Sequence, residues 1–201
     1  LNLAVLKCNS DYIFNQDFDD LPNLNRILLQ FEKLKNNQKL GAVGGWYFAN
    51  YLDISAIEKH YDKDDMVSIR WKLTFSLPFA HTFCGFRKSA ILDVGLYPIN
   101  SNQEDGVLWA KLINKGYEVG IVEENIGTHF IYRNSTYGAL RKKLKWELKF
   151  VREKLKIRSI LKLPFYHNLF IVLKFFYGYL PEKLKRFIRI KMPDYTDFKN
   201  K

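Results

Sequence analysis

The order of apolar and polar positions predicts alternating strands and helices over the first part of the chain. Residues 1–6 carry no helix start signal, and a short β-prone run at 11–16 follows them. Apolar residues then recur at helical spacing, with Pro22 placed in the first turn of a helix. A second apolar run, at 41–48, predicts the next strand. Strand, turn, helix and strand in this order form the building block of an open α/β sheet. The apolar stripe of the predicted helix is Leu24, Ile27, Leu28, Phe31 and Leu34.

The same reasoning extends the predicted domain to residue 138. Residues 71–86 are rich in aromatic and β-branched side chains and predict one or two strands, interrupted at Pro78. Glycines are expected to end the helices that follow. The remaining predicted elements are a helix at 88–94 ended by Gly95, a helix after the polar loop 100–105 ended by Gly116, and a strand at 118–122.

The pattern changes from residue 139 onward, where basic and bulky apolar residues alternate. A helix from Leu140 is predicted, with an apolar stripe and other faces crowded with lysine and arginine. The run 163–181 is strongly apolar, but polar residues interrupt it and it falls short of the roughly 20 residues of a bilayer span. We expect a helix lying in a membrane interface, and the alternative is a helix folded back on the body with solvated charges. The stripe of the first helix is Leu144, Leu148, Val151 and Leu155.

Charge is divided unevenly between these two parts. The net charge is +11, yet residues 1–138 hold 14 Lys and Arg against 16 Asp and Glu, whereas residues 139–201 hold 18 against 5. These counts predict a near-neutral folded body and a cationic C-terminal tail. A basic nucleic-acid-binding protein is the alternative, but the tail contains no recognition motif, so we expect no nucleic-acid partner. Because the spacing of Cys8 and Cys84 suggests neither a disulfide nor a zinc site and no secretory signal is present, we expect a cytoplasmic protein.

Two acidic clusters are the candidate site residues. Asp17 and Asp19 follow a predicted strand, at the edge where open α/β sheets bind ligands. Neighbouring carboxylates suit a hard divalent cation, Mn²⁺ or Mg²⁺, that also holds a diphosphate. Glu104 and Asp105 open a predicted helix, where a carboxylate within reach of a hydroxyl would act as a base. Each cluster also has a simpler interpretation, a solvated acidic turn for the first and dipole stabilisation of a helix for the second.

Three segments, in this order, resemble glycosyltransferase family 2, whose members are nucleotide-sugar glycosyltransferases with the GT-A fold. Residues 11–22 are similar to the strand and Asp-x-Asp turn of that family, and residues 83–95 to its Phe-Arg-Lys-Ser segment. Residues 102–117 are similar to its Glu-Asp motif, helix and Lys-Gly-Tyr ending. The resemblance implies an α/β fold, a partial GT-A (Rossmann-like) open sheet with flanking helices, followed by a basic amphipathic helical segment at 139–201.

The resemblance also implies roles for individual residues. Asp105 would be the catalytic base, with Glu104 assisting it. Lys111 stands where the family commonly has arginine, and lysine cannot reproduce a bidentate contact. His129 matches a third metal ligand of some members, although a histidine near a strand end is often structural. The implied metal ligands are Asp19, Asp17 and His129, and the implied substrate-binding residues are Asp17, Asp20, Trp109 and Lys111.

The implied activity is transfer of a sugar from a nucleoside-diphosphate sugar donor to a glycan or lipid-linked acceptor, inverting and metal-dependent. Family members begin with a strand and nucleotide-binding loop that residues 1–138 almost entirely lack, so we expect the C-terminal two-thirds of a GT-A domain, inactive by itself. A peripheral position on the inner face of a membrane would suit a lipid-linked acceptor. A non-catalytic scaffold with the same fold is the second alternative.

Overall fold

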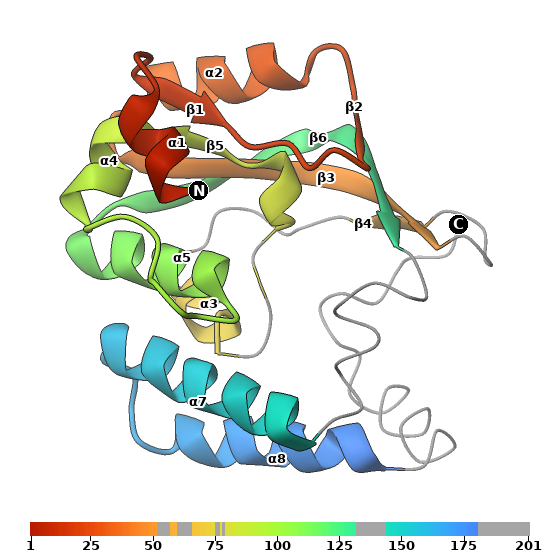
Figure 1. Ribbon diagram of the computed structural model, residues 1–201, viewed down its shortest axis with the longest axis vertical. Helices are drawn as coiled ribbons and strands as arrows, with labels where there is room; N and C mark the ends of the chain where they lie inside the picture. The colour runs from red at the N-terminus through yellow and green to blue at the C-terminus, as the bar shows by residue number, and fades with distance from the viewer. Residues whose placement is uncertain (52–56, 60–65, 75–76, 78, 132–143, 181–201) are drawn as a thin grey trace.

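The computed structural model describes residues 1–51, 57–59, 66–74, 77, 79–131 and 144–180. Over these residues it is a six-stranded mixed sheet with helices on both faces (Figure 1). The strands are β1 (Tyr12–Phe14), β2 (Leu21–Pro22), β3 (Leu40–Tyr51), β4 (Ile57–Lys59), β5 (Gly85–Arg87) and β6 (Glu118–Ile131). The helices are α1 (Asn2–Lys7), α2 (Arg26–Asn36), α3 (Met66–Lys72), the 3₁₀ helix η1 (His81–Phe83), α4 (Lys88–Asp93), α5 (Glu104–Lys115), α7 (Leu144–Ile160) and α8 (His167–Tyr179).

Strand direction brings several chain segments to one edge of the sheet. The order is β1-β5-β3-β6-β2, with β4 also paired to β3. Strands β3 and β6 are parallel, whereas β5 is antiparallel to both β1 and β3. Strands β1, β3 and β6 therefore run the same way and end at the same edge. The 3₁₀ helix η1 lies at that edge too, because it enters the oppositely directed β5.

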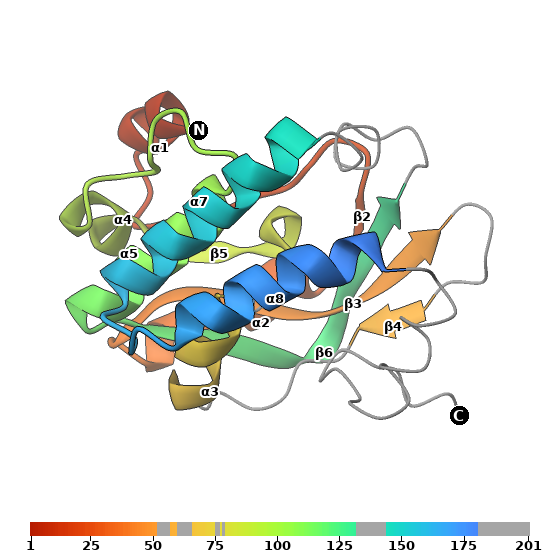
Figure 2. The same cartoon turned by 90° about the horizontal axis from the view of Figure 1, so that it is seen from below.

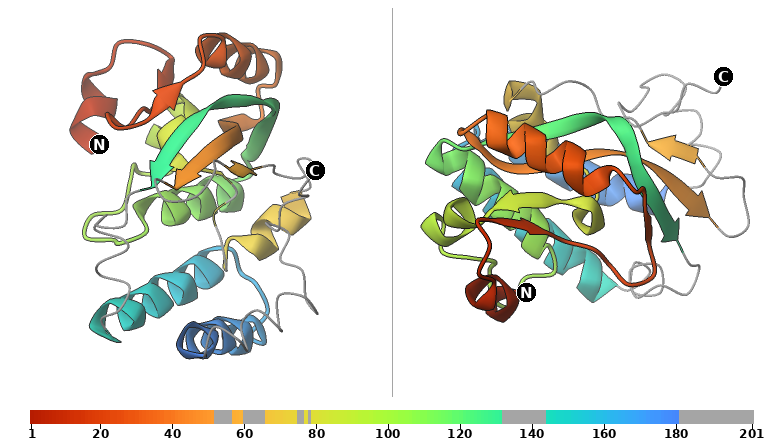
Figure 3. Two further views of the ribbon diagram at one scale, coloured as in Figure 1. Left: turned by 90° about the vertical axis from the view of Figure 1, so that its right-hand side faces the viewer. Right: turned by 90° about the horizontal axis from the view of Figure 1, so that it is seen from above.

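The molecule is layered, and both faces of the sheet are buried. Helix α2 covers one face, α5 and α3 lie under the other, and α7 and α8 form a further layer below α5 (Figures 1 and 3). Fully buried side chains such as Leu34, Val43 and Ile126 fill the core on the α2 side. Ala42, Leu108 and Ile157 belong to the core on the α5 and α7 side. Burial on both faces explains why β3 reads as an almost continuous apolar run.

A glycine in the central strand allows an unusually close contact. A Cβ atom added at Gly44 would lie 2.2 Å from the ring of Phe79, which is far inside van der Waals contact. The Phe79 ring is in turn 5.0 Å from that of Trp109 on α5. Gly44 thus lets the helix layer approach the sheet.

Most predicted elements are confirmed, including the glycine-ended helices α4 and α5, but three predictions are wrong. Residues 2–7 form helix α1. Pro22 lies in β2, where it pairs with Gly127, and α2 begins only at Arg26. Of the described residues in the segment 71–86, only Gly85 and Phe86 lie in a strand, β5, and Trp71 lies in α3.

The predicted apolar stripes were also misplaced on α2 and α7. Leu24 lies just before α2, and Ile27 and Leu28 lie in its first turn, and all three side chains are exposed. The buried residues of the helix are Arg26, Gln30 and Leu34. On α7 Leu148 is exposed, whereas Lys154 is buried. The predicted start of this helix at 140–143 lies outside the described residues. Among the helices that the structure describes, none is long and apolar enough to cross a bilayer.

Candidate functional site

The acidic segment after β1 forms a tight turn whose ends are fixed by hydrogen bonds. The backbone N–H of Asp17 donates to the Thr82 hydroxyl at 3.0 Å, and the N–H of Asp20 donates to the Asp17 carbonyl at 3.3 Å. The Gln16 amide donates to the carbonyls of Asp17 and Asp20 at 2.9 and 3.1 Å. Asp17 at the first turn position is a favourable choice. The turn leaves Asp19 and Phe18 exposed at its tip.

A buried arginine, which the sequence analysis did not single out, supports this turn from behind. Arg26 on α2 is 2% exposed and donates hydrogen bonds to the Asn15 carbonyl and the Gln16 side chain. Its Nε also donates to Gln30 Oε1 at 3.1 Å, and its guanidinium lies 5.3 Å from the centre of the Phe83 ring. Burial lowers the pKa of Arg26 to about 10, so it stays charged at neutral pH. Arg26 therefore places a fixed cation next to the acidic turn.

Asp20 and His129 form a buried pair between the turn and the end of β6. His129 Nδ1 lies 2.8 and 2.9 Å from the two carboxylate oxygens of Asp20, and the backbone N–H of Phe130 donates to Oδ1 at 2.9 Å. The Asp20 side chain has no exposed surface, whereas that of His129 is 32% exposed. A carboxylate that accepts a hydrogen bond from Nδ1–H fixes the ring and its tautomer and leaves Nε2 as the acceptor nitrogen, the usual support of a metal-binding histidine. Asp20 is thus placed to orient His129 and not to touch a ligand directly.

His81 on η1 is a second residue of this edge that the sequence analysis missed. Its Nδ1 lies 3.3 Å from the Asn15 side-chain amide, and its Nε2 lies 3.0 Å from the Tyr97 hydroxyl. Desolvation raises the pKa of Asp17, and nearby Asp20 and Asp19 add to the rise, whereas His81 and His129 lower it. The turn, η1 and the end of β6 therefore surround one carboxyl group. An isolated histidine after an aromatic run offers no sequence signal for this role.

Glu104 and Asp105 open helix α5 at the same edge of the sheet. Because α5 leads into the start of the parallel strand β6, its own first turn lies where the strands end. Both residues are half-buried, and Asp105 Oδ1 accepts a 2.6 Å hydrogen bond from the N–H of Gly106. Burial raises the pKa of the Cys84 thiol, and the carboxylates of Asp105 and Asp17 both raise it further. Both acidic clusters therefore act on the pKa of one buried thiol.

Helix α7 supports the first turn of α5 from the other side. The Ser101 hydroxyl, in the loop before α5, donates to Glu153 Oε2 at 2.7 Å. The neighbouring Lys154 is 2% exposed and donates to the Leu73 carbonyl at 2.8 Å. Burial lowers the pKa of Lys154 to about 7, Lys174 lowers it further, and Asp105 raises it. The position of Asp105 therefore depends on the packing of α7.

Two predicted substrate-binding residues make internal contacts in the structure. Trp109 has no exposed surface, and its ring stacks on that of Phe86 with 5.3 Å between centroids. Its indole N–H has no hydrogen-bond partner in the part of the chain that the structure describes. Lys111 donates to the Leu96 carbonyl at 3.0 Å, and burial followed by Lys156 lowers its pKa. Trp109 is a core residue beneath the site, and Lys111 holds the loop after α4.

The residues at this edge suit a divalent cation, although the described side chains do not by themselves form a complete set of metal ligands. Among the described residues no group of three or more His, Cys, Asp and Glu side chains is arranged to hold a metal ion. Asp19 and Asp17 supply exposed carboxylates, and the oriented imidazole of His129 supplies a nitrogen from β6. Sites of this open kind take their remaining ligands from water and substrate phosphate, which is common for Mg²⁺.

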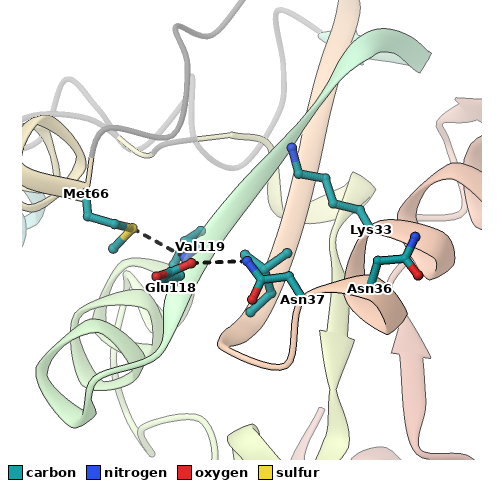
Figure 4. Close-up of a pocket in the computed structure, with 7 residues that line it drawn as sticks. Lys33, Asn36, Asn37, Met66, Glu118 and Val119 are labelled. Carbon is teal, nitrogen blue, oxygen red and sulfur yellow. Dashed lines mark hydrogen bonds between the residues drawn. The ribbon is translucent and has the colours of Figure 1, made fainter.

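A pocket of about 400 Å³ lies elsewhere, at the beginning of β3 and β6 (Figure 4). Asn37 there donates to Glu118 Oε2 at 3.2 Å, and the Val119 N–H meets Met66 Sδ at 3.5 Å. Ligands of open α/β sheets bind at the opposite edge, outside the carboxyl ends of the strands. We therefore place the candidate site at the edge that holds the acidic clusters. The pocket is lined by Lys33, Asn36, Asn37, Leu40, Met66, Glu118 and Val119.

The arrangement is an open α/β sheet with carboxylates and a histidine at its carboxyl edge, and known glycosyltransferases share the fold. An uncharacterized glycosyltransferase of Haemophilus influenzae is 25% identical over 167 residues, which are 80% of this chain and 61% of that protein. The mannosyltransferase PcManGT of Pyrobaculum calidifontis, solved with GDP-Man and Mn²⁺, matches with a TM-score of 0.55 and 12% identity, over 89% of this chain and 52% of its own. TarS 1–349 of S. aureus, solved with UDP-GlcNAc, matches with a TM-score of 0.56 and 11% identity, over 88% and 51%.

These matches show the fold of the chain, which the sequence analysis predicted correctly. No protein-family model matches the chain. The chain spans about 61% of the length of its Haemophilus relative and about half of each solved glycosyltransferase.

Proposed function

We propose that this chain carries the metal-binding and acceptor-activating part of a nucleotide-sugar glycosyltransferase of family 2. What supports the proposal is that the segments carrying both acidic clusters and His129 all lie at the carboxyl edge of a glycosyltransferase-like sheet, where Asp20 holds His129 at 2.8 Å. A solvated acidic turn alone would not explain the buried Asp20–His129 pair or the charged Arg26 behind the turn. The hydrogen bonds that hold Asp20, His129 and Arg26 in place support a functional site at this edge.

In the proposed reaction Asp105 takes the proton from an acceptor hydroxyl as the oxygen attacks the anomeric carbon. The new carbon–oxygen bond forms as the bond to the donor diphosphate breaks, with inversion at the anomeric carbon. Glu104 helps to hold the acceptor. A divalent cation, when bound, would offset the charge of the leaving diphosphate.

Asp19 and Asp17 would hold that cation from the turn, and His129 Nε2 would hold it from β6, with Mn²⁺ or Mg²⁺ as the metal. The Asp20 carboxylate fixes the tautomer of His129, and Arg26 keeps the turn in place. The structures of PcManGT and TarS contain GDP-Man and UDP-GlcNAc. We accordingly propose a nucleoside-diphosphate sugar as donor and a glycan or lipid-linked acceptor.

The proposal is tested by binding of UDP- and GDP-sugars to the full-length protein, with Mn²⁺ and with EDTA. Binding of one donor class that requires Mn²⁺ is expected, and Asp19→Ala should weaken it about 100-fold. The matched control is Glu124→Gln, which removes an exposed acid from β6 and should leave binding unchanged. Donor binding that is equal with EDTA and Mn²⁺ would contradict the proposed metal site.

A further inference from the structure

Helix α8 buries a histidine on its inward side and exposes a run of apolar residues on its outer side. His167 has no exposed surface and Ile171 is 3% exposed, so this side of α8 packs against the body. The His167 ring lies 4.7 Å from that of Trp71, and among the described residues neither of its ring nitrogens has a hydrogen-bond partner. Burial lowers the pKa of His167, and Arg158 lowers it further, so the ring is neutral. A water-exposed helix normally shows the reverse arrangement.

The outer side of α8 is an apolar stripe that nothing in the described structure covers. Leu169 and Phe176 are each 59% exposed, and Phe165 just before the helix is 77% exposed. Soluble proteins rarely expose apolar patches of this kind without an interaction partner. The stripe consists of Leu169, Val172, Leu173, Phe176 and Tyr179.

Basic residues surround this apolar stripe. Helices α7 and α8 lie side by side as the outermost layer of the molecule, on the side away from the sheet (Figure 2). Lys149, Arg152 and Lys156 recur at helical spacing on the exposed side of α7. Residues 144–180 hold eight Lys and Arg against two Glu, and residues 181–201 add seven against three acids. A second copy of the chain would bring the same positive charge, which disfavours self-association through this layer.

We propose that the α7–α8 layer binds the surface of an anionic lipid membrane, with α8 lying in the plane of the interface. The 13 residues of α8 span about 20 Å, which is too short for a hydrocarbon core of about 30 Å. Leucine and aromatic side chains on one side with lysine and arginine beside them are typical of interfacial helices. Basic residues next to anionic headgroups strengthen such binding. The surface is distinct from the candidate site and does not depend on the proposed transfer activity.

The test is co-sedimentation of the full-length protein with vesicles of neutral phosphatidylcholine, alone or mixed with anionic phosphatidylglycerol. Binding is expected to the anionic vesicles, and to fall about tenfold in the neutral vesicles or in 1 M salt. The double variant Leu173→Glu, Phe176→Glu should bind the anionic vesicles at least about tenfold more weakly. The readout is membrane binding, so its failure is distinguishable from failure of sugar transfer.

A matched control comes from the opposite side of the molecule. Leu24 and Ile27 are 102% and 56% exposed on the α2 side of the sheet, so Leu24→Glu, Ile27→Glu introduces the same charges away from α8. This variant should bind vesicles as the parent does. Equal loss in both variants, or binding to neither vesicle type, would overturn the proposal. A parent dimer that Leu173→Glu, Phe176→Glu converts to monomer without loss of vesicle binding would assign the stripe to self-association and overturn it as well.

Discussion

Residue by residue, the candidate site combines exposed ligands with buried supports. The exposed members are the acids of the turn and the edge of the His129 ring, and the buried members are Asp20 and Arg26. Buried charged groups are costly unless paired, and both of these are hydrogen-bonded. This pattern separates residues that would contact a ligand from residues that position them.

Asp20→Asn tests that separation. The asparagine amide can still fill the space, but it carries no negative charge to accept the hydrogen bond from His129 Nδ1–H. The imidazole therefore becomes a weaker metal ligand, and its ring is less firmly oriented. Loss of such a support typically costs about 10- to 100-fold in metal affinity. Mn²⁺ titration followed by electron paramagnetic resonance should show this loss in Asp20→Asn and none in Glu124→Gln. Unchanged affinity in Asp20→Asn would remove His129 from the metal site.

Among the elements, those that were predicted well bury apolar residues or end at a glycine. Helix α5 ends at Gly116 with φ of 102°, which only glycine adopts readily, and β3 is buried on both faces. Helix α2 was misread because its inward face carries Arg26 and Gln30, which hydrogen-bond to backbone groups near the site. Apolar periodicity finds a core-facing stripe, whereas these polar residues are buried for their hydrogen bonds.

The residues of the candidate site divide in the same way, into those that a local sequence pattern predicts and those that it does not. Asp17, Asp19 and Asp105 stand in recognisable local patterns, whereas His81 and Arg26 meet the turn only through contacts between segments distant in sequence. Trp109 was among the implied substrate-binding residues, but its side chain is fully buried.

The contact between β3 and the helix layer predicts the effect of Gly44→Ala. The added methyl group would overlap the Phe79 ring, so the strand or the ring must move. Overpacking of this kind costs about 1–3 kcal/mol in the free energy of unfolding. Chemical denaturation should show this loss, and Phe79→Leu should be less harmful in the Gly44→Ala background than in the parent. Strict additivity of the two substitutions would contradict the contact.

The buried lysine of α7 predicts a pH dependence of stability. Lys154 has a folded-state pKa of about 7, below the ordinary value of 10.5, so between these values the unfolded chain binds more protons than the folded chain. Stability must then rise with pH across this window, by up to about 1.4 kcal/mol per unit. Lys154→Met should flatten the curve of unfolding free energy between pH 7 and 10. Parallel curves for parent and variant would show that Lys154 is not buried in solution.

At the scale of the whole molecule, the layers separate two tasks. The carboxyl edge of the sheet gathers the candidate catalytic groups, and the α7–α8 layer supplies both the support of α5 and the proposed lipid-binding surface. An acceptor carried by a lipid would be reached from a protein held at the membrane surface. The packing of α7 on α5 connects the candidate site with the proposed lipid-binding surface, because Glu153 and Lys154 lie next to the first turn of α5, which holds Asp105.

The central claim is that one acidic cluster binds the donor through a metal and the other activates the acceptor. The most direct measurement is a side-by-side assay of Mn²⁺-dependent donor binding and sugar transfer in the full-length protein and its Asp105→Asn variant. The account predicts that Asp105→Asn binds donor within about twofold of the parent while transfer falls by about 100-fold or more, because only the base is lost. Transfer at the parent rate in Asp105→Asn, or loss of donor binding equal to the loss of transfer, would contradict it.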